Sequence, residues 1–202
     1  MSERAPKAVV DWGWAGRGLE RQSGDLHAVV PFPGGTLIGL VDGLGHGPEA
    51  EAAAVMAVSV LHQHAAESLE TLLSRCHDAL RKTRGAVINL ASFSSHDRSM
   101  CWIGVGNIEG VLLRRSRVRS HEALVARGGV VGYTFPAVRG HQLSVDPGDT
   151  LIFSTDGIRS GFTTDLVTEH PPQEIAESIL ARFSTGTDDA HVVVARYLGG
   201  EG

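Results

Sequence analysis

Apolar runs and regular hydrophobic spacings divide this chain into predicted strands and helices. The clearest run starts at Leu37 and ends abruptly at Asp42, and glycines follow it at 43, 45 and 47. A run rich in Leu, Ile and Val that turn residues close is typical of a strand buried on at least one face, so Asp42 is expected at the rim of a core strand. The glycines can take positive φ and let a ligand approach the backbone, although an ordinary strand-to-helix turn would show the same pattern.

Three segments carry the pattern of helices. Pro48 is tolerated in a first helical turn and precedes an alanine-rich segment, which predicts a helix over about 48–66. Leucines that recur every three or four residues predict an amphipathic helix over about 69–84. A pair of prolines at 171–172 stands where a third helix can begin, and apolar residues continue its pattern through 174–183.

The remaining apolar runs predict strands, several of them in a meander. In chain order they are expected at 7–12, 25–32, 37–42, 86–93, 100–106, 108–113, on both sides of a Pro-Gly turn in 141–156, and at 191–197. The runs from 86 to 113 are joined by short polar or glycine turns, which is typical of an antiparallel meander. Blocks of strands and blocks of helices, rather than strict alternation, indicate an α+β fold in layers, and we expect a single domain over 1–202.

The composition excludes several classes of protein. The 202 residues are 42% hydrophobic and 20% charged, as in a globular protein. A net charge of −5 leaves no general attraction for nucleic acid or for anionic lipid, so neither is an expected partner. No segment approaches the run of about 18 apolar residues that spans a membrane, and the two cysteines lack metal-binding spacing. We therefore expect a cytoplasmic protein.

Acidic residues stand at the ends of several predicted strands. Asp42 and Asp156 each end an apolar run and precede a glycine, Asp25 begins a strand, and Asp188 and Asp189 come just before the last strand. If neighbouring strands bring these ends together, the carboxylates repel one another unless cations lie between them. Hard oxygen ligands without a Cys or His cluster favour Mg²⁺ or Mn²⁺ over Zn²⁺, copper or calcium. Two such ions can hold a phosphate and activate a bridging water to hydroxide, which indicates hydrolysis of phosphate.

Five motifs in this order resemble those of the metal-dependent PPM (type 2C) protein serine/threonine phosphatases. They are Ser23-Gly-Asp25, Val41-Asp-Gly-Leu-Gly-His-Gly47, Gly104-Val-Gly-Asn107, Ser154-Thr-Asp-Gly157 and Asp188-Asp-Ala190, and the resemblance covers about 8–197. Within the family they look most like the compact bacterial RsbX/SpoIIE group, and most like RsbX in that group. The resemblance implies αββα layers, a central antiparallel β-sandwich flanked by helices, with the site at one end. The stretch 107–156 looks too short for a flap subdomain.

The resemblance also implies a role for each acidic motif residue. Asp42 would bridge two metal ions, and the Gly43 carbonyl would bind one of them. Asp156 and Asp188 would hold the other ion, and Asp25 would act through metal-bound water. The cofactors implied are therefore two Mn²⁺ or Mg²⁺ ions.

Three positions depart from the family pattern. Eukaryotic members have a histidine, proposed as general acid, directly after Asp-Gly; Leu44 stands there, and His46 is the candidate for a role that stays open. The phosphate-binding arginine of those members would fall at Glu20, so Arg21, one place further along, is the candidate phosphate ligand. Asn107 replaces an aspartate that is associated with a third metal in longer members, and no tight third site is expected.

Pattern and resemblance together predict a phosphatase that acts on phosphoserine or phosphothreonine in a partner protein. By resemblance to RsbX, the partner is a scaffold or antagonist protein of a bacterial stress-signalling complex that dephosphorylation resets. A binding module without turnover is one alternative, which the retained acids disfavour. A phospho-accepting receiver domain is another, which the lack of regular βα alternation disfavours. The basic run Arg114–Arg119 could dock an acidic partner, but a strand edge protected by charge is favoured.

Overall fold

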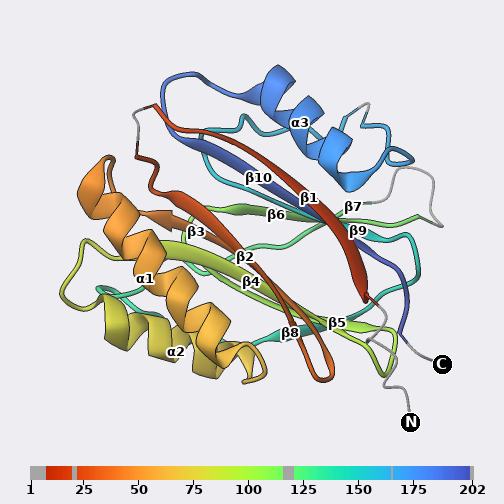
Figure 1. Ribbon diagram of the computed structural model, residues 1–202, viewed down its shortest axis with the longest axis horizontal. Helices are drawn as coiled ribbons and strands as arrows, with labels where there is room; N and C mark the ends of the chain where they lie inside the picture. The colour runs from red at the N-terminus through yellow and green to blue at the C-terminus, as the bar shows by residue number, and fades with distance from the viewer. Residues whose placement is uncertain (1–7, 20–21, 116–120, 165, 201–202) are drawn as a thin grey trace, which may run out of the picture.

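Two antiparallel sheets lie face to face at the centre of the molecule (Figure 1). The structure, a computed structural model, describes residues 8–19, 22–115, 121–164 and 166–200. One sheet has the strand order β1 (Val10–Arg17), β10 (Ala190–Tyr197), β9 (Thr150–Ser154), β6 (Glu109–Leu113) and β7 (His121–Ala123). The other has the order β2 (Asp25–Phe32), β3 (Gly35–Gly43), β4 (Ala86–Ser94), β5 (Ser99–Val105) and β8 (His141–Ser144).

Three hydrophobic clusters define four layers. Between the sheets, large side chains such as Leu40 and Phe153 are fully buried. Helices α1 (Pro48–His64) and α2 (Leu69–Leu80) pack on the outer face of the sheet that contains β3, and α3 (Pro172–Phe183) packs on the outer face of the other sheet. Burial of each large apolar side chain contributes about 1.5–3 kcal/mol. The predicted αββα arrangement is confirmed.

Helix α1 places the glycine-rich segment after β3 next to the sheet. It begins at Pro48, and the missing N–H of proline costs nothing there, because an N–H in the first turn has no partner within the helix. Its alanines at 50, 53, 54 and 57 are all buried, and such small side chains let the helix lie close to the strands beneath it. The first turn of α1 therefore stands directly beside the end of β3.

Several boundaries differ from those predicted. The strand expected at 7–12 is β1, which starts later and runs to Arg17. The helices end at 64 and 80 rather than 66 and 84; after α2, the Thr83 amide and hydroxyl both donate to the Leu80 carbonyl and close the helix. The run at 108–113 is β6, which leaves the meander and pairs with β9 in the other sheet. Strand β7 was not predicted.

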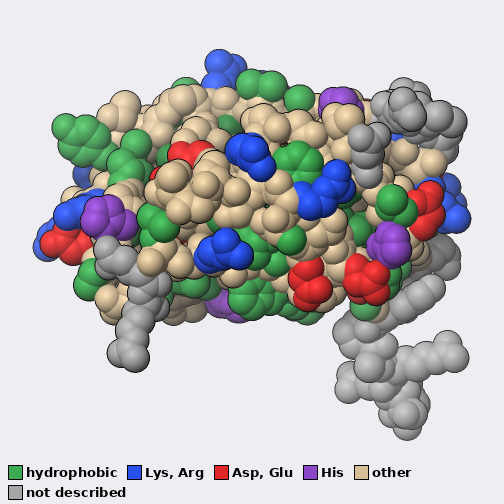
Figure 2. All heavy atoms as spheres, turned by 90° about the horizontal axis from the view of Figure 1, so that it is seen from above, with side chains coloured by type: hydrophobic (Ala, Val, Ile, Leu, Met, Phe, Trp, Pro, Cys, Tyr) green, Lys and Arg blue, Asp and Glu red, His purple; other side chains and the backbone are tan. Residues whose placement is uncertain are grey.

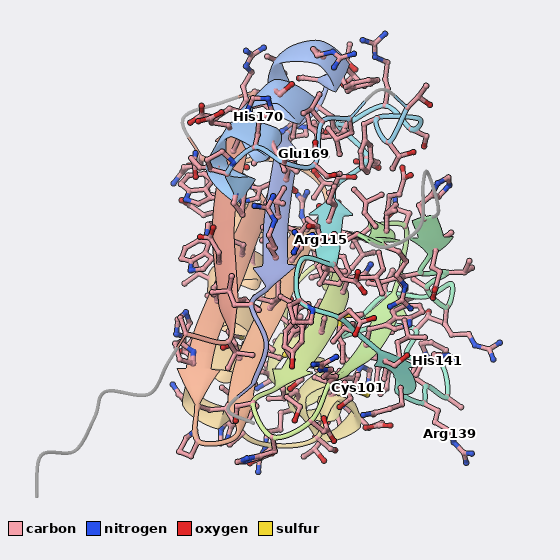
Figure 3. All side chains as sticks on the ribbon, turned by 90° about the vertical axis from the view of Figure 1, so that its right-hand side faces the viewer. Cys101, Arg115, Arg139, His141, Glu169 and His170 are labelled. Atoms are coloured by element: carbon pink, nitrogen blue, oxygen red, sulfur yellow. The ribbon has the colours of Figure 1, made fainter. Side chains whose placement is uncertain are left out.

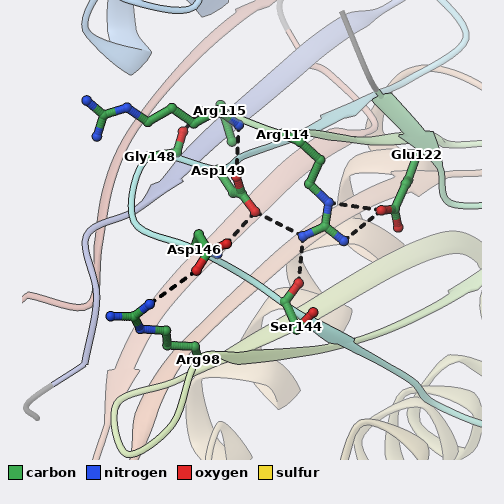
Figure 4. A network of polar contacts seen from close by, with 9 residues as sticks. Arg98, Arg114, Arg115, Glu122, Ser144, Asp146, Gly148 and Asp149 are labelled. Atoms are coloured by element: carbon green, nitrogen blue, oxygen red, sulfur yellow. Dashed lines mark hydrogen bonds and ion pairs between the residues drawn. The ribbon is translucent and has the colours of Figure 1, made fainter. Parts of the chain in front are cut away.

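Arg114, the first residue of the basic run Arg114–Arg119, forms hydrogen bonds and ion pairs within the fold and does not protect a solvated strand edge (Figure 4). The Arg114 side chain is only 14% exposed and donates to Asp149 at 2.9 Å, to Glu122 and to the Ser144 carbonyl at 2.6 Å. These bonds join the residue after β6 to β7, to the end of β8 and to the residue before β9. Residues 116–120 lie outside the described part of the chain, so docking by this run stays a prediction. Figure 3 faces this side of the molecule, with Arg115 and His141 labelled.

On the face seen over α3, acidic, basic and apolar side chains are interspersed (Figure 2). In the described part of the chain, no helix is both long enough and apolar enough to cross a membrane.

Candidate active site

The start of β2 and the end of β3 bring two aspartates together. In the antiparallel register Asp25 lies directly opposite Asp42, so both side chains point to the same face of the sheet. The Gly43 amide donates to the Gly24 carbonyl at 3.0 Å and continues this pairing past the acids. Like charges directly opposite each other destabilise a strand pair, and this arrangement therefore needs a compensating charge.

The other sheet presents its acids at the same end of the molecule, which is the end away from the turn between β2 and β3 (Figure 1). Strand β9 ends two residues before Asp156, and β10 begins directly after Asp189. The Thr155 amide donates to the His191 carbonyl at 3.0 Å, which extends the pairing of β9 with β10 to this edge. Strand ends that are far apart in the sequence thus meet, as predicted.

A pocket of about 580 Å³ lies where these strand ends meet. Five aspartates line it: Asp25, Asp42, Asp156, Asp188 and Asp189. The rest of the lining includes Leu44, Gly45, His46, Val87 and Val130. The four acidic residues predicted as metal ligands are therefore brought together, and Asp189 joins them.

Burial and mutual repulsion make two of these carboxyl groups hard to ionise. Burial, followed by the charges of Asp25, Asp156, Asp188 and Asp189, raises the pKa of Asp42 to about 8. Asp25 is only 3% exposed, and burial raises its pKa to about 7 although a hydrogen bond from a threonine opposes this. A divalent cation in the pocket would reverse both effects, because it favours the ionised forms.

The glycine after each Asp is required by close packing. A Cβ on Gly43 would overlap the Ala50 carbonyl in the first turn of α1, and a Cβ on Gly157 would overlap the Asp189 carbonyl. Positive φ occurs at Gly45 (92°) and Gly47 (76°), but Gly43 is the last residue of β3, so the expectation of positive φ there is wrong. The Asp-Gly pairs let neighbouring backbone approach the acids.

Asp189 fastens the segment before β2 to the start of β10. Its two carboxylate oxygens accept hydrogen bonds from the Leu19 and Gly24 amides, both at 2.8 Å. Asp188 is exposed and accepts one from the Asp189 amide at 2.9 Å. The sequence assigned no role to Asp189, yet the alternation of side chains at a strand start places one of two adjacent acids inward.

An imidazole and aromatic cluster flanks the acids and was missed by the sequence analysis. His27 Nδ1 and His191 Nε2 are 2.9 Å apart and join β2 to β10. The Trp14 ring stacks on His191 with 5.1 Å between ring centroids. Burial lowers the pKa of His191 to about 3 and lowers that of His27, so both rings are neutral near pH 7. The sequence signal was spacing, because each histidine stands two residues after a pocket aspartate and side chains two apart in extended backbone point to the same side.

The donor set fits hydrated hard cations rather than a closed metal cage. Within the described ranges, no three His, Cys, Asp or Glu side chains converge closely enough to enclose an ion by themselves. Mg²⁺ usually keeps several waters and takes only one or two carboxylates, so this spacing suits it. Two carboxyl groups with raised pKa values, in a pocket lined by five aspartates, provide the charge that such ions require.

The remaining candidate residues have different outcomes. His46 lines the pocket and is exposed, so it can reach a bound substrate. Asn107 also lines it and donates to Asp156 Oδ2 at 2.9 Å. Arg21 lies outside the described residues, and its proposed contact with phosphate stays a prediction.

A second cavity, of about 640 Å³, lies at the far end of the sandwich beside the β2–β3 hairpin. Apolar residues such as Val9, Trp12 and Phe32 line it, and the described residues around it include no carboxylate. This cavity therefore lacks the acidic lining of the first pocket.

Comparison with known proteins agrees with the geometry of the pocket. The family model for stage II sporulation protein E (SpoIIE) matches residues 33–198, most of the chain. The chain belongs to the SpoIIE family. The match includes the strand ends that carry Asp42, Asp156 and Asp188.

Individual relatives of this SpoIIE-family chain agree with that assignment. Phosphoserine phosphatase RsbX of Bacillus subtilis (strain 168) is 23% identical over 158 residues, which cover 78% of each chain. The crystal structure of RsbX in complex with magnesium has a TM-score of 0.82 at 19% identity and covers 93% of this chain and 95% of that one. A chain from a study of the bacterial stressosome as a modular system that controls secondary messenger signalling has a TM-score of 0.83 at 28% identity, and covers 93% and 99%. The predicted family, the α+β fold and the enzyme class, a PP2C-type phosphatase, are confirmed.

Proposed function

We propose that this SpoIIE-family protein is a divalent-metal-dependent phosphatase that hydrolyses phosphoserine or phosphothreonine in a partner protein. The observation that carries the proposal is the pocket in which five aspartates from both sheets meet. The name of RsbX, a phosphoserine phosphatase, supports the substrate class. The likeness to a chain from a study of the bacterial stressosome supports a phosphorylated scaffold or antagonist protein of a stress-signalling complex as the partner, and dephosphorylation would reset that complex.

Each acidic residue has a proposed task at the metal site. Asp42 and the Gly43 carbonyl would hold one ion, and Asp156 and Asp188, with Asp42 shared between the two positions, would hold the other. Asp25 would act through a coordinated water, and further water would fill the positions that the carboxylates leave open. Two Mg²⁺ or Mn²⁺ ions bound there would neutralise the phosphoryl oxygens and lower the pKa of a water that attacks phosphorus in line.

The rest of the pocket positions these groups and the substrate. The Thr155 hydroxyl donates to Asp25 at 2.8 Å and Asn107 donates to Asp156, so two of the acids are held in fixed orientations. His46, which lines the pocket, would be the group that gives a proton to the leaving seryl or threonyl oxygen. Asp156 and Asp188 are exposed, and an open site of this kind admits the phosphorylated segment of a protein.

The test is release of phosphate from phosphorylated proteins encoded beside its own gene. We expect hydrolysis that requires Mn²⁺ or Mg²⁺, that a chelator abolishes and that added metal restores. Activity that resists the chelator would overturn the mechanism. Binding of the phosphoprotein without any release of phosphate would favour the alternative, a module that kept the fold and lost turnover.

A further inference from the structure

Arg84 lies at the rim of the acidic pocket but takes no part in the chemistry proposed above. It stands in the turn between α2 and β4. A Cβ on Gly45, which lines the pocket, would lie 2.6 Å from Arg84 Nη1, so the guanidinium rests against the Gly45 backbone. The Arg84 side chain is 51% exposed. A cation is thus held at the edge of a pocket that five aspartates line.

The backbone after Arg84 is fixed to the pocket lining, and the backbone before it is fixed to the end of α2. The Leu44 amide donates to the Gly85 carbonyl at 3.0 Å, which joins the turn to one wall of the pocket. The Gly85 amide donates to Thr83 Oγ1 at 3.0 Å within the turn. A Cβ on Gly85 would lie 2.7 Å from Val130, another residue of the lining. The position of the Arg84 Cα is therefore set by the pocket, and only its long side chain has freedom to move.

The guanidinium is paired with a carboxylate from the first turn of α1. Arg84 Nη2 and Glu49 Oε2 are 2.5 Å apart, and the two side chains are 51% and 68% exposed. An ion pair in such contact with water contributes little to stability. A carboxylate from another molecule can therefore replace Glu49 with little loss.

We propose that Arg84 forms an anion-binding subsite for the protein substrate and recognises an acidic residue next to the phosphorylated one; this rests on the proposed function. Arg84 lies beside the pocket lining and not within it, so it meets the chain that flanks the phosphoserine. Arginine presents paired N–H groups that match a carboxylate, and lysine does not. Glu49 occupies the subsite in the free protein, and the substrate's carboxylate takes its place.

Three substrates test the subsite in the presence of Mn²⁺: a phosphoserine peptide with acidic neighbours, the same peptide with neutral neighbours, and p-nitrophenyl phosphate. We expect the wild-type protein to prefer the acidic peptide through a lower KM. Arg84→Met should reduce this preference about three- to fivefold, as expected for an exposed ion pair, and Glu49→Gln should increase it. Arg84→Lys should retain only part of it. Arg81→Met is the matched control, because Arg81 is also exposed, pairs with Asp78 at 3.3 Å and should leave the preference unchanged.

The possible outcomes distinguish the subsite from a purely structural role of Arg84 and from contact with the phosphoryl group. The same preference in Arg84→Met and wild type, with both folded by circular dichroism, would overturn the subsite. An equal rise of KM for p-nitrophenyl phosphate would place Arg84 on the phosphoryl group and also overturn it. A wild-type protein that hydrolyses none of the three substrates would reject the proposed function, and the subsite with it.

Discussion

The Thr155 hydroxyl donates a hydrogen bond of 2.8 Å to Asp25 Oδ2 and so joins the two sheets at the acidic pocket. Thr155 follows β9 in one sheet, whereas Asp25 begins β2 in the other. The same hydroxyl oxygen accepts the His191 amide at 2.9 Å. One side chain therefore fixes a buried carboxyl group relative to β2, β9 and β10.

Replacing this hydroxyl should weaken both the fold and the site. Thr155→Val removes the donor to Asp25 and the acceptor of the His191 amide, and leaves both groups buried. We expect the free energy of unfolding, measured in urea, to fall by about 1–3 kcal/mol, with a parallel loss of metal-dependent activity. Thr155→Ser keeps the hydroxyl and loses a methyl group, and should cost only about 0.8 kcal/mol. Equal behaviour of the two variants would show that the bond does not position Asp25.

Neutralising a proposed metal ligand should separate activity from stability. Asp42→Asn and Asp156→Asn each remove a carboxylate from the pocket, and we expect each to abolish Mn²⁺-dependent hydrolysis of a phosphoserine protein without unfolding the chain. Asp42→Asn should also raise the melting temperature of the chelated protein at pH 8, because it removes a repelled charge. Asp11→Asn, on the exposed side of β1, is the control and should behave as wild type. Normal turnover in either pocket variant would refute the site assignment.

Close packing at the first Asp-Gly pair predicts a strong effect from a single methyl group. Gly43→Ala would place its Cβ against the Ala50 carbonyl and push α1 away from Asp42. We expect a loss of about 1–3 kcal/mol in the free energy of unfolding and reduced activity. Gly128→Ala, also in the pocket lining, has nothing within 4 Å of the added Cβ and should retain wild-type stability. Similar melting curves for the two variants would contradict this account.

The layers and the acidic site were predictable because both depend on local patterns. Hydrophobic spacing located the three helices, and aspartates at the ends of apolar runs indicated where a polar edge would form. The position of β6 was not predictable in this way, because its partner β9 is set by packing and not by the spacing within 108–113. Periodicity says that a segment is a strand; it does not say which sheet the strand joins.

The hydrogen bonds that orient the acids could not be predicted from the sequence for a related reason. Thr155 and Asp25 are 130 positions apart, and His27 and His191 are 164 apart. Such pairs become visible only when the register of two sheets is known. The basic run was misjudged for the same reason. Its charge pattern indicated a solvated strand edge, but Arg114 forms an ion pair with buried Asp149, which directly precedes the neighbouring strand β9.

Protonation of the pocket predicts how stability depends on pH in the absence of metal. The pKa values of Asp25 and Asp42 rise from 3.8 to about 7 and about 8 on folding, so the folded state holds protons that the unfolded state has lost. Stability is therefore lost as the pH rises through these values. His27 and His191, whose pKa values are lowered from 6.5, act in the opposite direction at lower pH. A window from pH 7 to pH 9 isolates the two aspartates.

Metal should cancel this loss, because the ions bind the ionised carboxylates and displace their protons. We expect the melting temperature in chelator to fall from pH 7 to pH 9, and the rise caused by saturating Mg²⁺ to be larger at pH 9. Asp42→Asn removes the group with the higher pKa and should flatten the dependence in chelator. Calorimetry should detect proton release when Mg²⁺ binds at pH 7. A stabilisation by Mg²⁺ that is equal at both pH values would show that the ions do not bind at Asp25 and Asp42.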